Sequence, residues 1–428
     1  MRRRPRARPA RGEPAGHRRQ VRRRRGDGGG AGTVVTTTLT GPRLLTPGPL
    51  DLAAERGRGT YEPPACRDVI AELAAAGLRG RGGAGFPAHV KWRAVADAPG
   101  PRVVVANGEE GEPSSHKDRW LLTNRPHLVL DGLLLAARTV GADRAVVYLS
   151  HAETVTAVRA AIAEMPPLDG PVPEVHVVEP TYVAGEETAV CRSIGGGPAL
   201  PLARPPRVCD SGVDGRPTLV SNVETLAHAA WISRNGAAAY RENGTEDSPG
   251  TTLVTLTGAC ADPGVYEVPF GLTVAELFAH AGGFIGEPAG FVMGGWFGGL
   301  LGPSHTGTTC TYEAVRAAGS GLGCGAITAL PAGTDPLAVA ADITAWYARE
   351  SARQCGVCAK GTAAIRDVFA ALKDGTATDK DRGNLQRWGE TLPGRGACAF
   401  LDGAAGWART VRAEFPTSFE RDLGREET

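Results

Sequence analysis

The sequence predicts an α/β domain, then a small β-rich segment, then a helical C-terminal region. Three observations carry this prediction. Short apolar runs alternate with helix-periodic segments between residues 66 and 178, two short β-type runs flank a Pro-Gly turn after residue 250, and apolar residues recur at helical spacing beyond Asp335. Strands that alternate with helices favour a mostly parallel sheet. A chain of 428 residues has room for two to four such domains.

The α/β part begins with a helical segment at residues 66–77, which ends on Gly77, a residue suited to cap a helix C-terminus. Buried strands are expected at residues 102–106, 144–150 and 174–178, and helices at 128–139 and 154–164. In the C-terminal region, helices are expected at 337–350, 361–372, 385–388 and 404–415. We expect a disordered basic tail over residues 1–40, the α/β domain over 41–248, the β-rich domain over 249–332 and the helical domain over 333–428.

The composition excludes several classes of protein. Residues 1–25 hold twelve arginines against one acid, Glu13, although the whole chain carries a net charge of only +1. We expect this tail to be a solvated extension without a nucleic-acid function, although an RNA- or lipid-binding arm is an alternative. The sequence contains no apolar run of about 18 residues, so we predict no membrane span. No apolar segment follows the arginines, so we predict no secretory signal. Nine cysteines are too few for a disulfide scaffold of this length, which favours a reducing cytoplasm.

A glycine-rich loop reads GLRGRGGAGFPAHVKW from Gly77 to Trp92. Gly80, Gly82 and Gly85 match G-x-G-x-x-G, but the loop follows a predicted helix rather than a strand, which argues against a dinucleotide fingerprint. Glycines still allow the backbone to approach a phosphate or a flavin ring, and free N–H groups can bind an anion.

Three further loops are rich in acids and amides. They read NGEEGEP from Asn107, YVAGEET from Tyr182 and SNVET from Ser221. The first follows a predicted strand, and ligands of α/β proteins bind at the carboxyl edge of the sheet. A glycine loop with a basic residue and three such polar loops predicts a site for a phosphate-bearing redox cofactor with a polar ring.

These four segments, in this order, resemble one family: the flavin-bearing, NADH-binding subunit of respiratory complex I (the F subunit of NADH-quinone oxidoreductase), with relatives in NAD-dependent hydrogenases and formate dehydrogenases. The resemblance covers about residues 60 to 420. It implies an FMN- and NADH-binding α/β domain, an SLBB-type β-grasp domain and a helical iron–sulfur domain. It also implies that Glu112 and Glu187 act at the nicotinamide. The implied cofactor-binding residues are Gly80, Arg81, Gly82, Gly83, Gly85, Phe86, Lys91, Asn107, Glu109, Glu110, Tyr182, Gly185, Glu186, Ser221, Asn222 and Thr225.

The chain departs from the family where the adenine of NADH would stack on aromatic rings. Phe86 matches one ring, but the second position is Ala94 and the third is Arg207. An arginine there could stack on a purine or bind the extra phosphate of NADPH, or nicotinamide binding could be weak or lost. Glu109 also replaces the usual Asp, and Ser221 replaces an Asn.

The expected [4Fe–4S] site is one ligand short. Cys355 and Cys358 lie in QCGVC and Cys398 in GACAFLDGAA, while Ala352 stands where the family has its first cysteine. Three alternatives stay open: a [4Fe–4S] or [3Fe–4S] cluster on three cysteines, no cluster, or a zinc or redox C-x-x-C site.

The sequence therefore predicts a flavoprotein oxidoreductase that passes electrons from NAD(P)H through FMN and an iron–sulfur cluster to a partner, a thioredoxin-like ferredoxin or a small ferredoxin. Association with a membrane would be peripheral, through a complex. One alternative is a paralogue outside complex I that uses another donor and has an incomplete or absent cluster. The other is a non-catalytic scaffold.

Overall fold

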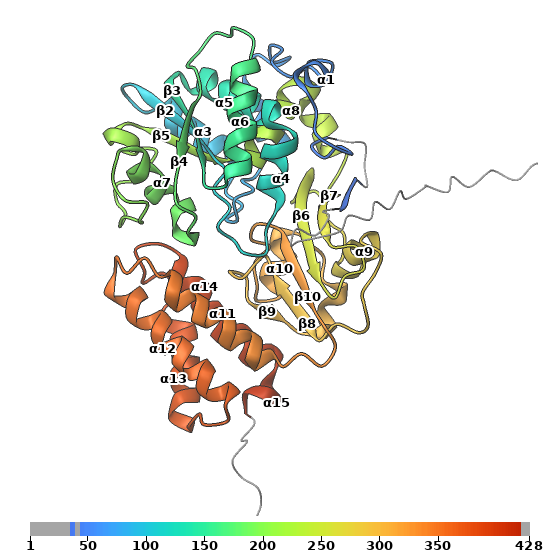
Figure 1. Cartoon of the computed structure of the whole chain (residues 1–428), viewed down its shortest axis with the longest axis vertical. Helices are drawn as coiled ribbons and strands as arrows, with labels where there is room; N and C mark the ends of the chain where they lie inside the picture. Colours follow the sequence, from blue (N-terminus) through green and yellow to red (C-terminus); the bar gives the residue numbers. More distant parts are fainter. Residues whose placement is uncertain (1–34, 39–42, 421–428) are drawn as a thin grey trace, which may run out of the picture. The chain divides into compact units, whose positions relative to one another are not determined.

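In the computed structural model, residues 35–38 and 43–420 are described (Figure 1). The α/β part is built on a fully parallel sheet of four strands in the order β4-β3-β2-β5. The strands are β2 (Arg102–Asn107), β3 (Ala142–Leu149), β4 (Glu174–Val177) and β5 (Thr218–Asn222). Strand β3 lies next to β2, and β4 lies next to β3 on the same side. Strand β5 then lies on the opposite side of β2. This reversal creates a switch point, where the carboxyl ends of two neighbouring strands diverge and leave room for a ligand.

The switch point brings two candidate site residues together. Asn107, the last residue of β2, pairs in register with Asn222, the last residue of β5. Both strands are buried over most of their length up to these residues, so the two amide side chains stand at the edge of the sheet where the strands end.

Some helices of the α/β part contact this sheet, and the others pack against those helices. The helices of this part are α1 (Leu52–Arg56), α2 (Val69–Ala76), α3 (Ala88–Ala96), α4 (Lys117–Asn124), α5 (Pro126–Val140), α6 (Ala152–Glu164), α7 (Glu187–Ile194) and α8 (Val223–Arg241). Gly77 caps α2 in the left-handed conformation, with φ of 68°, as the sequence predicts. Helix α5 is buried along almost its whole length, because it packs against α8 and the sheet.

The second sheet is mixed and has the order β1-β7-β6-β10-β8-β9. Its strands are β1 (Val35–Thr38), β6 (Thr251–Gly258), β7 (Gly264–Pro269), β8 (Gly290–Met293), β9 (Leu300–Leu301) and β10 (Ala326–Leu330). Strands β6 and β7 form an antiparallel hairpin, and β10 lies parallel to β6. With helix α9 (Val274–His280) and the short α10 (Tyr312–Ala317), this arrangement confirms the expected β-grasp domain.

The expected disordered tail over residues 1–40 falls mostly outside the described residues. For Val35–Thr38 the expectation is wrong, because this segment forms strand β1 and pairs in parallel with β7. The run VTTT is rich in β-branched residues, which favour strands, but the arginine- and glycine-rich sequence before it hides this local signal.

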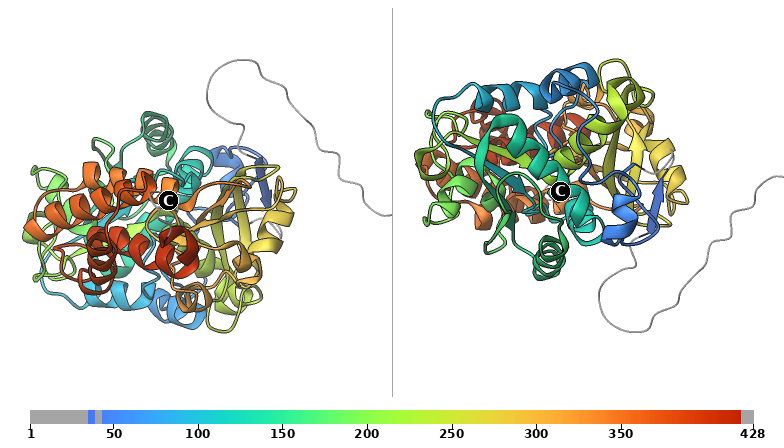
Figure 2. Two further views of the ribbon diagram at one scale, coloured as in Figure 1. Left: turned by 90° about the horizontal axis from the view of Figure 1, so that it is seen from below. Right: turned by 90° about the horizontal axis from the view of Figure 1, so that it is seen from above.

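The C-terminal region is helical, as predicted: α11 (Pro336–Glu350), α12 (Gly356–Lys373), α13 (Asp379–Thr391), α14 (Phe400–Glu414) and α15 (Pro416–Phe419). These helices, orange to red in Figures 1 and 2, pack around an apolar core that includes Trp346, Phe369 and Trp407. Among the described residues, no helix is long and apolar enough to cross a membrane.

The close packing of α5 against α8 gives a stability prediction. An added Cβ at Gly132 in α5 would lie 2.2 Å from the carbonyl oxygen of Leu226 in α8. We expect Gly132→Ala to lower the free energy of unfolding by about 1–3 kcal/mol, the usual range for an overpacked core. Gly383→Ala is the matched control, because Gly383 lies in α13 with no atom near its would-be Cβ. It should raise that energy by up to about 1 kcal/mol. Urea unfolding of both variants measures the difference, and equal effects would contradict the packing argument.

Candidate functional site

A cavity of about 500 Å³ opens at the switch point of the parallel sheet. This volume lies within the usual range of small-molecule sites, roughly 300–1,000 Å³. All four loops singled out from the sequence line it, joined by the β-grasp residues Gly294, Gly323 and Cys324 and by Cys398 and Phe400 of the helical region. The cavity therefore lies where all three parts of the fold meet.

The glycine loop forms one wall, and its shape requires glycine. Gly83 and Gly85 have φ of 118° and 62°, a region that other residues rarely adopt. A Cβ at Gly85 would lie 2.7 Å from the Tyr312 ring, while the Tyr312 hydroxyl donates to the carbonyl of Gly80 at 3.2 Å. A Cβ at Gly82 would meet Asn222 at 3.4 Å. The β-grasp domain thus supports the glycine loop through Tyr312, and the backbone of the loop forms part of the cavity wall.

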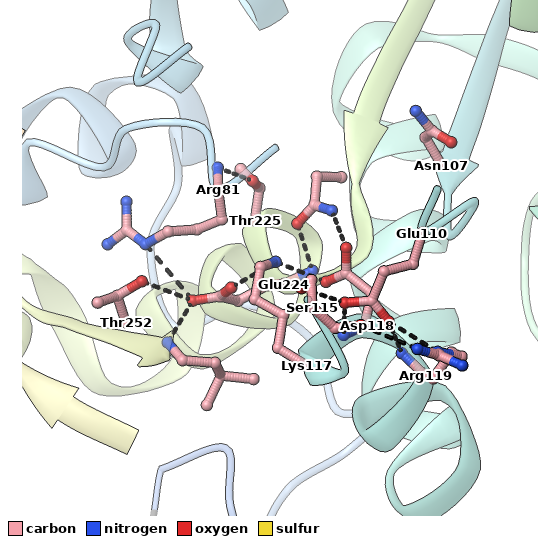
Figure 3. A network of polar contacts seen from close by, with 12 residues as sticks. Arg81, Asn107, Glu110, Ser115, Lys117, Asp118, Arg119, Glu224, Thr225 and Thr252 are labelled. Carbon is pink, nitrogen blue, oxygen red and sulfur yellow. Dashed lines mark hydrogen bonds and ion pairs between the residues drawn. The ribbon is translucent and has the colours of Figure 1, made fainter. Parts of the chain in front are cut away.

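A buried ion network supports this wall (Figure 3). The Glu224 carboxylate contacts the Lys117 ammonium at 2.8 Å and accepts from the backbone N–H of Leu253 at 2.8 Å. Lys117 also contacts Asp118 at 2.7 Å, and Asp118 accepts from the Asn222 amide at 2.6 Å. Burial alone would raise the pKa of Glu224, but Lys117 and its other partners outweigh burial and lower the pKa to about 2. Glu224 is therefore a carboxylate at any ordinary pH.

Arg81 belongs to this network and not to the cavity lining. Its backbone N–H donates to the Thr225 hydroxyl at 2.9 Å, and its guanidinium donates to the Tyr240 hydroxyl and the Thr251 carbonyl at 2.8 and 2.9 Å. The guanidinium also lies 3.6 Å from Glu224. The side chain of Arg81, a residue predicted to bind the cofactor, therefore points into the protein and fixes the glycine loop from there. Sequence alone could not separate the two roles, because both use an arginine between glycines.

The side chains of Asn107 and Glu110 form hydrogen bonds that join the loops around the cavity. The Asn107 amide donates to the Gly185 carbonyl at 2.9 Å, which joins the first acidic loop to the second. Glu110 accepts from the Ser115 hydroxyl and from the backbone N–H groups of Asp118 and Arg119 at the start of α4. Its carboxylate lines the cavity but already has these partners.

Glu109 and Glu112 are different, because burial raises the pKa values of their carboxyl groups and so favours the uncharged form. Burial raises the pKa of Glu109 to about 8 and that of Glu112 to about 7. Glu112 accepts from the Trp296 backbone N–H at 2.9 Å and from the Ser114 hydroxyl at 3.1 Å. One carboxyl oxygen of Glu109, Oε1, is buried without a hydrogen-bond partner. Both side chains line the cavity, so a ligand there would meet carboxyl groups able to donate a hydrogen bond.

Two glutamates of the second acidic loop, Glu186 and Glu187, form ion pairs with basic side chains. Glu187 contacts Lys91 at 2.7 Å and Arg204 at 3.1 Å, and Arg204 also contacts Glu186 at 2.5 Å. Burial works to raise the pKa of Glu187, but Lys91 and then Arg204 hold it below its usual value. Glu186 additionally caps α7 by accepting from the N–H groups of Thr188 and Ala189. Arg204 is a cavity residue that the sequence did not predict, since its only signal was a basic residue before the Pro-Pro pair.

The aromatic positions divide into those at the cavity and those away from it. Phe86 lines the cavity with 53% of its surface exposed, so its ring is open for stacking. Tyr182 lines it too but packs edge-on against Trp346 at 5.1 Å between ring centroids. Ala94 and Arg207 do not line the cavity. Arg207 is 70% exposed at its side chain and pairs with Asp210, so a purine or phosphate bound by Arg207 would lie outside this cavity.

The residues present fit a flavin mononucleotide. The glycine wall can take a flat ring, and the N-terminus of the 19-residue helix α8, next to Ser221, Asn222 and Thr225, suits a phosphate. Two buried polar atoms of lining residues lack partners, Glu109 Oε1 and the indole nitrogen of Trp92. Buried polar groups normally find a partner, so these atoms point to a polar ligand.

Of the three candidate metal ligands, Cys398 alone lines the cavity. Cys355 is the N-cap of α12, Cys358 lies buried in its first turn, and Cys398, just before α14, lines the cavity. Within the described residues, no three His, Cys, Asp or Glu side chains are close enough to hold a single metal ion. The iron–sulfur, zinc and redox C-x-x-C alternatives all stay predictions for these cysteines.

Comparison with known proteins agrees with this geometry. Residues 73–231 match the family described as the Nuo51 FMN-binding domain, 253–295 the SLBB domain, and 338–422 the NADH-ubiquinone oxidoreductase-F iron–sulfur binding region. The F subunit of NADH-quinone oxidoreductase in Mycobacterium tuberculosis is 34% identical over 362 residues, covering 79% of this chain and 80% of the relative. The F 2 subunit of the same enzyme in Rhizobium meliloti is 32% identical over 385 residues, covering 86% and 90%.

Solved structures give the same result for the fold. A chain of the NAD+-reducing [NiFe]-hydrogenase in the air-oxidized state matches with a TM-score of 0.82 and 32% identity, covering 91% of this chain and 68% of that one. The same type of enzyme in the H2-reduced state matches with a TM-score of 0.78 and 34% identity, but this chain spans only 63% of that chain's length.

The two near-neutral acids give a pH prediction for the cofactor-free protein. Their carboxyls have pKa values of about 8 and 7 when folded, above the ordinary 4.5. Stability from a raised carboxyl pKa is complete below the unfolded value and is lost as pH rises through the folded one. We therefore expect the free energy of unfolding to fall between pH 4.5 and 8, and Glu109→Gln to remove part of this fall. The exposed Glu276→Gln is the control. Urea unfolding at several pH values measures it, and an unchanged slope in the Glu109 variant would contradict the assignment.

Proposed function

Because this chain belongs to the family of the F subunit of NADH-quinone oxidoreductase, we propose that its cavity binds FMN, and that a reduced nicotinamide dinucleotide enters the same cavity and delivers a hydride to the flavin. The observation that carries this proposal is the cavity itself: a glycine wall, a helix N-terminus and two unpartnered buried polar atoms meet at the switch point. When bound, FMN accepts two electrons as a hydride and can release them one at a time.

On the flavin side, we assign backbone contacts to Gly80, Gly82, Gly83 and Gly85, and phosphate contacts to the start of α8. The side-chain amide of Asn222 already has partners, because it donates to Asp118 and accepts from the Glu224 N–H. We therefore assign to Asn222 the positioning of the helix start and no direct side-chain contact with the phosphate. Thr225 likewise anchors the glycine loop through Arg81. Glu109, with its raised pKa and its unpartnered oxygen, is the acid placed to donate a hydrogen bond to a polar ring edge.

On the nicotinamide side, we assign Phe86 as an open ring for stacking and Glu187 as the group that orients the carboxamide. Glu187 is held by two cations, Lys91 and Arg204, so its position is fixed by both. Arg204 also offers the cavity a guanidinium that can pair with a diphosphate, since arginine binds phosphate oxygens in a bidentate manner. Glu112 also lines the cavity, and its predicted role at the nicotinamide stays part of this proposal.

Electrons leave on the side of the helical region. Cys398 and Phe400 line the cavity, so the iron–sulfur-binding region begins at the flavin site itself. We propose that the acceptor is an iron–sulfur carrier, either a thioredoxin-like ferredoxin or a small ferredoxin, and that the domains divide near residues 41, 249 and 333. The missing rings at Ala94 and Arg207 favour a paralogue that performs this chemistry outside complex I.

The hydride step can be tested at Glu187. We expect Glu187→Gln to slow reduction of the bound flavin by NADH by about ten- to a hundredfold, because the loss of one charge-assisted hydrogen bond costs roughly 1.5–3 kcal/mol. FMN should stay bound, since the flavin contacts are assigned to other residues. Stopped-flow absorbance measures the rate, with Glu174→Gln as the control on the exposed Arg144 pair. An unchanged rate with full FMN would remove Glu187 from the mechanism.

Arg204 and Arg207 form a natural pair for a second test. Arg204 lines the cavity and Arg207 does not, although both flank the same Pro-Pro pair. Arg204→Ala should raise KM for the dinucleotide about tenfold, the effect of losing roughly 1.4 kcal/mol of phosphate binding. Arg207→Ala should leave KM nearly unchanged. Steady-state kinetics with NADH and NADPH decide this, and the reverse order of effects would show that the wrong arginine has been assigned.

A further inference from the structure

The region matched as iron–sulfur binding contains too few ligands for a closed cluster. Residues 338–422 hold three cysteines, Cys355, Cys358 and Cys398, and no histidine. A cuboidal [4Fe–4S] cluster has four irons, each normally bound by one thiolate. One iron would therefore lack a cysteine in this chain.

The three thiols and Ala352 all lie at the apolar core of the helical region. Cys358 is part of the apolar core of the helical region, and Cys355, Cys398 and Ala352 all pack against that core. The thiols come from two separate segments, the start of α12 and the turn before α14, which is how a cluster would tie the two helices together. Ala352 is the fourth member of this group, and its side chain cannot bind iron.

Oxygen donors near the thiols are engaged elsewhere. The Ser351 hydroxyl lies 3.3 Å from the Cys358 sulfur, which is hydrogen-bonding distance, so it supports that ligand instead of occupying a separate corner. Asp402 accepts from the Gly394 N–H at 2.8 Å. Glu186 caps α7 and pairs with Arg204. None of these groups points to a fourth protein ligand.

We propose that Cys355, Cys358 and Cys398 hold a cuboidal iron–sulfur cluster whose fourth iron, beside Ala352, has no protein ligand. The presence of the cluster rests on the proposed function; the open iron rests on this chain's own residues. Arg353 and Gln354, which follow Ala352, are exposed, so solvent and small ligands can reach this side. Cys398 lines the flavin cavity, so a cluster held by this cysteine would lie next to the flavin site.

An iron without a protein ligand is released easily. A one-electron oxidant would convert [4Fe–4S]2+ into [3Fe–4S]+ with release of one Fe2+, a step in which charge and atoms balance. Iron and a reductant would restore the four-iron form by the reverse step. The chain would then carry a cluster whose iron content responds to oxidants and to iron supply.

The test uses the full chain, purified without oxygen, and three variants. Ferricyanide is the one-electron oxidant, and the readouts are iron and sulfide content and the EPR spectrum. The wild type should release about a quarter of its iron and show the signal of an oxidised [3Fe–4S] cluster. Ala352→Cys should keep its iron and show no such signal. Ala363→Cys, on helix α12 but outside the group, should behave as the wild type, and Ser351→Ala should still bind the cluster.

Several outcomes would overturn the proposal. They are full retention of iron by the oxidised wild type, identical behaviour of Ala352→Cys and the wild type, or loss of the cluster in Ser351→Ala, which would make the serine a ligand. A wild type without iron and sulfide, whose flavin is nevertheless bleached by NADH, would also overturn it while leaving the hydride step intact. Conversely, the expected EPR result with no bleaching would leave the open iron standing and remove the proposed function.

Discussion

The site depends on one buried carboxylate, that of Glu224. It binds Lys117, lies beside Arg81 and accepts from the backbone of Leu253, so helix α8, helix α4, the glycine loop and strand β6 meet at a single group. Removing one partner of a buried ion pair typically costs about 3–5 kcal/mol, because the remaining charge is left unpaired. The cavity wall therefore cannot relax independently of the two domains that share this network.

The glutamates that line the cavity differ in charge, because their surroundings shift their pKa values in different directions. Glu187 stays charged because Lys91 and Arg204 face it, whereas Glu109 and Glu112 are buried with few opposing charges and titrate near neutral pH. A flavin that gains and loses charge during turnover needs both kinds of neighbour: charged groups that orient a cationic or polar substrate, and neutral acids that can donate a hydrogen bond. The three glutamates have the same chemistry in the sequence, and only their surroundings in the fold separate them.

Much of the fold could be predicted from the sequence. The alternation of apolar runs predicts β2, β3 and β4, and helical spacing predicts α2, α5, α6 and the C-terminal helices α11 to α14. Helices α3, α4, α7 and α8 and strand β5 were not predicted, because they overlap or adjoin the glycine and acidic loops, whose polar residues hide the periodicity. Those polar residues are the site. The roles of Arg81 and Arg204 were also beyond the sequence, since each depends on contacts made across the fold: Arg81 with Tyr240 and Thr251, and Arg204 with Glu186 and Glu187.

The central claim is that one cavity binds a flavin that a nicotinamide reduces. The most direct measurement is the visible spectrum of the anaerobically purified full chain, with iron and sulfide analysis, before and after addition of NADH. The account predicts a bound flavin whose absorbance bleaches on reduction, in a protein that also contains iron and sulfide. Flavin that stays oxidised with both NADH and NADPH would contradict the hydride step, and a colourless protein would contradict the assignment of the cavity itself.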